Sequence, residues 1–134
     1  MKFIVAFLLV LIYSKVDATS EAYLISLRDS SRTAFSNLES GGAYLDGLGY
    51  SQQKTDAVYV LSTLYSLAEM SLPPYNYPLK EEIANYDGST ALSTIVSILN
   101  TYASGAPADY RTYLESAYVY TIQAQQAVRN VANS

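Results

Sequence analysis

The chain has 134 residues, with no Cys, no His and no Trp but fourteen Tyr, and its formal net charge is −4. Without Cys or His there is no thiol nucleophile, no Cys/His zinc site, no disulfide framework and no Ser-His-Asp triad. The composition therefore excludes many common catalytic and metal-binding chemistries before any motif is considered.

The first eighteen residues have the pattern of a secretory signal peptide. Lys2 supplies the positive charge, residues 3–12 form an apolar run, and Ala18 is a small residue of the kind that precedes cleavage. A membrane anchor needs about 20 apolar residues, and this run is shorter. We therefore expect residues 1–18 to be removed, no integral membrane anchor, and a secreted, extracellular protein consisting of one domain at 19–134.

Cleavage would also remove Lys2, Lys15 and Asp17, so the mature chain would be one unit more negative than the full sequence. An acidic surface repels phosphate backbones and anionic lipids, so nucleic acid is not an expected partner. Phe35 would be the only phenylalanine left, against thirteen tyrosines. Tyrosine and alanine must therefore help to complete the core.

Apolar residues recur with helical spacing in the first half of the mature chain. One helix is predicted over residues 20–40, where Gly41-Gly42 would end it. A second is predicted over residues 52–71 after a Ser51 cap, and the prolines that follow would end it. The side chains expected to point inward from this second helix are Val58, Leu61, Leu64, Tyr65, Ala68 and Leu72.

The second half of the chain shows three more helical stretches. A short helix is predicted over residues 79–86, and a longer one runs from Thr90 to about Ser104 behind a Ser89 cap. In the longer helix, the predicted apolar stripe is Leu92, Ile95, Val96, Leu99 and Tyr102. The last helix starts at Pro107, a residue suited to a first helical turn. Its seam repeats at alternating steps of four and three, which is a heptad pattern, through Tyr110, Leu114, Ala117, Thr121, Ala124, Val128 and Val131.

These stretches predict an all-α fold, an antiparallel up-and-down four-helix bundle with the third helix interrupted near Asp87-Gly88. Short links make this topology economical. It would place the link at 41–50 and the turn at Gly105 at one end, and the link at 73–78 with both termini at the other. Ala, Ser and Thr at seam positions would let the helices approach closely.

Two links between helices contain candidate contact residues. The link at 41–50 holds four of the six glycines but lacks the Lys and Ser/Thr that a phosphate loop requires. It is either a compact loop folded over the bundle end or a glycine-hinged lid. The link at 73–78 holds three prolines that favour an extended backbone, on which Tyr75 and Tyr77 are either displayed to a partner or packed on the bundle base.

The carboxylates show no catalytic or metal-binding pattern. Glu81 and Glu82 are adjacent and point in different directions on a helix, and Glu69 and Glu115 have no evident companion. We therefore predict no catalytic residue, no metal ligand and no cofactor, and solvated helix faces for these acids.

Tyrosine is the remaining signal, because an exposed tyrosine presents a large rigid ring with a polar tip. The alternative is that tyrosine replaces phenylalanine at the core boundary. The candidate contact residues are Tyr44, Tyr50, Tyr75, Tyr77, Tyr110, Tyr113, Tyr118 and Tyr120.

Two functional hypotheses follow from these features. The first is a non-enzymatic binding protein that takes a small apolar or amphipathic ligand, or an extracellular protein partner through tyrosine-rich faces. The second is a structural or surface-active component of a secretion, such as a coat, glue, foam or tyrosine-crosslinked matrix. Neither hypothesis fixes the oligomeric state.

Overall fold

The computed structural model describes residues 2–134, and it describes side chains from Glu21 onwards. The fold is all-helical, as predicted, and the described residues contain no strand. The helices are α1 (Lys2–Gly47), α2 (Ser51–Ser71), α3 (Lys80–Ala84), α4 (Thr90–Tyr102) and α5 (Ala108–Ala132). The predicted signal peptide at 1–18 lies outside the residues whose side chains are described, so it stays a prediction.

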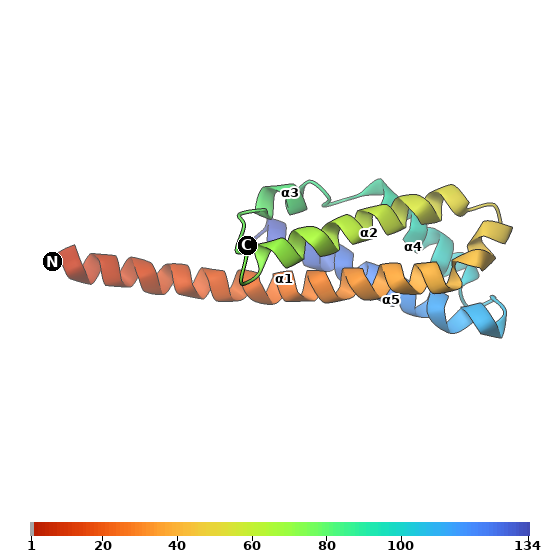
Figure 1. Ribbon diagram of the computed structural model, residues 1–134, viewed down its shortest axis with the longest axis horizontal. Helices are drawn as coiled ribbons and strands as arrows, with labels where there is room; N and C mark the ends of the chain where they lie inside the picture. Colours follow the sequence, from red (N-terminus) through yellow and green to blue (C-terminus); the bar gives the residue numbers. More distant parts are fainter. Residues whose placement is uncertain (1) are drawn as a thin grey trace.

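The three long helices lie side by side. α1 packs along α5 and α2, while α3 and α4 contact α2 and α5. Figure 1 shows that α2 runs back against the direction of α1, and that α5 runs back against α4. The first part of α1 extends beyond the other helices, and the C-terminus lies near the link between α2 and α3 (Figure 1).

The contact between α1 and α5 is built on two matching heptad stripes. On α5, the predicted seam is buried from Leu114 to Val131, with Tyr110 half-buried at its start. Six buried residues of α1 repeat with the same steps, namely Leu27, Ser31, Ala34, Leu38, Gly41 and Leu45, while Ser30 and Gly42 are buried beside this stripe. An antiparallel register follows from the 3.1 Å hydrogen bond that Asn37 Nδ2 donates to Ser116 Oγ and from the stacking of Tyr44 on Tyr110. Small side chains on both stripes let these two helices approach closely.

Gly41-Gly42 does not end the first helix, which is a correction to the sequence prediction. α1 continues to Gly47, and only residues 48–50 are non-helical. The reason is tertiary: a Cβ on Gly41 would lie 3.0 Å from both Leu114 Cδ2 and Tyr113 Cβ, so glycine is needed there for close packing rather than for a turn. The predicted 41–50 loop and the glycine-hinged lid built on it are therefore wrong.

The start of α2 also differs in detail from the prediction. The N-cap residue is Tyr50, not Ser51, and it makes no side-chain capping bond. Ser51 Oγ instead donates to Asp46 Oδ1 at 2.8 Å, and Lys54 Nζ lies 2.7 Å from the same carboxylate oxygen. The hydrogen bond from Lys54 is the main cause that lowers the pKa of Asp46, and the hydrogen bond from Ser51 lowers it further. Side-chain bonds therefore tie the end of α1 to the start of α2.

The inward face of α2 was predicted in part. Leu61, Leu64 and Ala68 are buried, and so is Leu72 just after the helix. Val58 and Tyr65 are only half-buried, and Ala57 and Val60 are buried on α2 as well.

A short non-helical segment, residues 85–89, separates α3 from α4. Gly88 has a φ of +74°, which a non-glycine residue rarely adopts. Ser89 caps α4, because its hydroxyl accepts a 3.4 Å hydrogen bond from the backbone N–H of Leu92. Leu92, Ile95 and Leu99 are buried as predicted; Ile98 takes the deep position expected of Val96.

Candidate functional site

The link between α2 and α3, residues 72–79, is a hydrogen-bonded turn rather than the extended segment that its prolines suggest. The backbone N–H groups of Tyr75 and Asn76 both donate to Leu72 O, each at 3.1 Å. Tyr77 N donates to Met70 O at 2.9 Å, which folds the link back against the last turn of α2. We call this segment the proline loop.

The proline loop displays its two tyrosine rings next to each other. Tyr75 and Tyr77 are each 53% exposed, and their ring centroids are 6.1 Å apart with a tilt of 44° between the planes. The sequence left open whether these rings are displayed or packed on the bundle base, and the structure shows both rings exposed.

The rings of the proline loop and a stripe of α2 together line an open groove. The cavity measures about 410 Å³ and is lined by Tyr65, Ser66, Glu69, Met70, Tyr75 and Tyr77. We call this cavity the tyrosine groove. Its volume is within the range of small-molecule sites, which typically combine an apolar lining with a few polar groups.

The sequence prediction missed the α2 side of the groove. Tyr65 was expected to point inward, and Glu69 was treated as an isolated surface acid. The lining residues of α2 fall at helical spacing, which places Tyr65, Ser66, Glu69 and Met70 on one face. That spacing was readable, but only the folded-back proline loop turns this face into a site.

Charged groups border the groove at its Glu69 side. Arg28 of α1 places its Nε 2.9 Å from Asp29 Oδ1 and 3.9 Å from Glu69 Oε2. The hydrogen bond with Asp29 is the main cause that raises the pKa of Arg28, so this side chain stays cationic. Two carboxylates therefore share one guanidinium, and the trio keeps one net negative charge beside the groove.

The tyrosines at the opposite end of the helices pair with each other. Tyr44 and Tyr110 stack at a centroid distance of 6.1 Å, and their planes differ by 19°. Tyr50 and Tyr102 lie 5.6 Å apart, with their hydroxyl oxygens at 3.3 Å, and this hydrogen bond raises the pKa of Tyr50. All four rings are half-buried against the core. They therefore act as boundary packing of α1, α4 and α5.

The three remaining candidates lie on α5 and do not join the groove. Tyr118 and Tyr120 are half-buried and pack against the core, whereas Tyr113 is 44% exposed. The structure therefore brings together only Tyr75 and Tyr77 of the eight candidates in an open cavity. Among the residues with described side chains, the most exposed tyrosine is Tyr59 at 68%, which is not one of the candidates.

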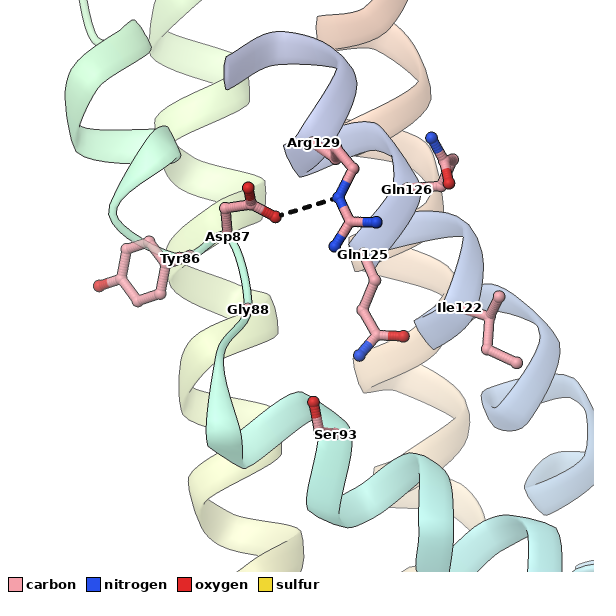
Figure 2. Close-up of a pocket in the computed structure, with 8 residues that line it drawn as sticks. All are labelled: Tyr86, Asp87, Gly88, Ser93, Ile122, Gln125, Gln126 and Arg129. Carbon is pink, nitrogen blue, oxygen red and sulfur yellow. Dashed lines mark ion pairs between the residues drawn. The ribbon is translucent and has the colours of Figure 1, made fainter. Parts of the chain in front are cut away.

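A second hollow, of about 210 Å³, lies where residues 85–89 face α5. Figure 2 shows Arg129 reaching Asp87, with Nε 3.5 Å from Oδ1, while Gln125 and Ser93 point toward the same space. The ring of Tyr86 points away from Arg129 (Figure 2). This hollow is smaller and more polar than the tyrosine groove, and its carboxylate already has a partner.

Neither the residues with described side chains nor the comparisons identify a known type of site. Within the described part of the chain, no cluster of three Asp, Glu, His or Cys residues is placed to hold a metal ion. Among the same residues, no helix is both long enough and apolar enough to cross a membrane. No family model, curated protein or solved structure matches this chain.

Proposed function

We propose that this protein is a secreted, non-enzymatic binding protein whose ligand occupies the tyrosine groove. Secretion is supported by the charged, apolar and small-residue pattern of residues 1–18. We further interpret residues 19–134 as one domain, an antiparallel up-and-down four-helix bundle in which α3 and α4 together form the third member. The groove then lies at one end of the bundle, where the proline loop folds back against the last turn of α2.

The observation that carries the proposal is the pair of half-exposed rings on a backbone-bonded loop. If a tyrosine served only to complete the core, packing would bury most of its ring, as it does for the Tyr44–Tyr110 and Tyr50–Tyr102 pairs. Tyr75 and Tyr77 instead keep about half of their surface free, and the hydrogen bonds of the loop to Leu72 and Met70 hold the backbone that carries them. A loop whose backbone is ordered before binding loses little conformational entropy when a ligand arrives.

The lining favours an amphipathic small ligand. Three aromatic rings and Met70 offer apolar contact, while Ser66 and Glu69 provide polar groups at the border. The net charge of −4 disfavours nucleic acid and anionic lipid as partners.

The proposal can be tested with N-phenyl-1-naphthylamine, a neutral probe whose fluorescence rises in apolar sites. We expect saturable binding by the wild-type protein. The double variant Tyr75→Ala/Tyr77→Ala should bind about tenfold more weakly, because truncating two aromatic contacts removes about 1 kcal/mol or more.

Tyr59→Ala is the matched control, because Tyr59 is an exposed tyrosine of α2 that does not line the groove. It should bind the probe like the wild type. Equal binding by all three proteins would place the probe elsewhere and refute the tyrosine groove as the binding site.

The structural hypothesis keeps support from one observation, the exposure of Tyr59 and Tyr113, which lie outside the groove. In that case the protein would be coupled through tyrosine rings into an extracellular matrix. Protein purified from its source would then carry dityrosine fluorescence and multimers that survive denaturant, whereas a binding protein would be recovered as uncrosslinked chains with or without its ligand.

A further inference from the structure

The tyrosine groove combines aromatic faces with a carboxylate, and we propose that it selects small organic cations of the alkylammonium type. This inference rests on the proposed function, because it names the ligand class of the same groove. It goes further by assigning the sign of the ligand's charge and the group that the rings contact.

The ring geometry suits one ammonium group. A cation is attracted to the face of an aromatic ring when it lies within about 6 Å of the ring centroid. Because the centroids of Tyr75 and Tyr77 are 6.1 Å apart and their planes are tilted by 44°, one ammonium group can lie within that distance of both. Quaternary ammonium groups are weakly hydrated and bulky, so they lose less than a primary amine when they leave water for such a site.

Tyr65 supplies the third ring from α2. Its orientation is fixed from behind by Phe35, whose ring meets it edge-on at a centroid distance of 6.1 Å and an interplanar angle of 71°. Met70 completes the apolar wall. The lining of the groove is therefore built from two segments, a helix face and the proline loop.

The charge beside the groove has the sign that a cation requires. Glu69 lines the groove and is 44% exposed, and its nearest ion-pair partner, Arg28, lies 1 Å closer to Asp29. Arg28 also lies near Tyr65, a second lining residue of the groove. The positive charge of Arg28 thus repels a cationic ligand, but the two negative charges of Asp29 and Glu69 exceed it.

The hollow at the start of α4 lacks this combination. Its carboxylate, Asp87, is bridged by Arg129, and the Tyr86 ring points away from Arg129 (Figure 2). A cation there would meet a guanidinium rather than an aromatic face. Of these two hollows, the tyrosine groove is the one that pairs several aromatic rings with an incompletely compensated carboxylate.

The test compares choline with 3,3-dimethylbutan-1-ol, its uncharged carbon isostere, by NMR titration of the full-length protein. Choline should shift the signals of α2 and the proline loop and should bind about tenfold more tightly than the alcohol, since each exposed cation–π contact contributes about a two- to fivefold gain. If the alcohol binds there as well as choline does, the charge preference is refuted while the groove remains a binding site. If neither shifts these signals, the inference is refuted, and the naphthylamine assay decides separately whether the groove binds anything.

Charge variants make the test independent of folding defects. Glu69→Gln should weaken choline binding several-fold, and Arg28→Gln should strengthen it, because each removes one charge of known sign beside the tyrosine groove. Glu115→Gln is the matched control, an exposed glutamate of α5 outside the groove, and should change nothing. Opposite or absent effects of the two charge variants would overturn the proposal.

Choline also occurs as a lipid headgroup, and we assign the groove to a free small molecule because a cavity of about 410 Å³ is of the size that holds one small ligand. Vesicles of phosphatidylcholine provide the final arm. Co-sedimentation with these vesicles, without binding of free choline, would overturn the choice of a free ligand.

Discussion

The tyrosine pairs of this protein differ in exposure because their partners lie in different places. Tyr44 pairs with Tyr110 of α5, and Tyr50, in the link before α2, pairs with Tyr102 of α4, so these rings become part of the packing. Tyr75 and Tyr77 find each other on one short loop, which leaves both half exposed. Residue type alone therefore did not show which of these rings pack against the core and which are exposed.

Glycine shows the same dependence on neighbours, and it leads to a prediction about stability. Gly41→Ala should destabilise the protein by about 1–2 kcal/mol, because the new methyl group would overpack the buried Leu114 and the Cβ of Tyr113, which outweighs the better helix propensity of alanine. Urea denaturation followed by circular dichroism measures this difference.

Gly47→Ala is the matched control for that substitution. Nothing lies within 4 Å of a Cβ built there, and the residue is helical, so alanine should stabilise the protein by about 0.5–1 kcal/mol. Two stabilised variants would show that α1 and α5 do not approach as closely at Gly41 as the structure indicates.

At the scale of elements, the seam between α1 and α5 contains polar atoms that a core rarely keeps. Ser31 and Thr121 are completely buried, and neither hydroxyl has a hydrogen-bond partner among the described residues. A buried polar group without a partner costs free energy, because it has lost its bonds to water. Removing such a hydroxyl from the seam should therefore raise the free energy of unfolding.

Thr121→Val should stabilise the protein by about 1 kcal/mol, because valine keeps the shape of threonine and removes the unpaired hydroxyl. The midpoint of urea denaturation reports the change. Thr63→Val makes the same chemical change at a site where the hydroxyl donates a 2.8 Å hydrogen bond to Tyr59 O, so it should not stabilise. A loss of stability in Thr121→Val would mean that this hydroxyl is hydrogen-bonded in solution.

The elements that the sequence predicted well are those whose signal is local. The heptad of α5 and the Ser89 cap depend on spacing within a few residues, and both agree with the structure. The end of α1 was wrong because the role of Gly41 is set by α5, more than sixty residues away in the chain. Of the groove, the sequence predicted only the residues of the proline loop. Tyr65 and Glu69 become part of the site only because the proline loop folds back against α2, which the sequence did not predict.

At the scale of the whole molecule, the core begins well inside α1. Among the residues with described side chains, the first that pack against the core are Tyr23 and Leu24, and the first fully buried one is Leu27. The part of α1 that precedes them extends beyond the other helices (Figure 1). The residues that line the groove therefore all follow the segment predicted to be cleaved.

This arrangement predicts that a chain of residues 19–134 folds as stably as the full-length protein, and that protein recovered from a secretory host has the mass of 19–134. Equal urea midpoints and unchanged helical circular dichroism would support the first point, and intact mass spectrometry tests the second. Leu27→Ala in the shortened chain is the positive control, and it should lose about 2–5 kcal/mol, because Leu27 is fully buried. A shortened chain that unfolds without a cooperative transition would show that residues 1–18 belong to the fold, which would also count against their being a signal peptide.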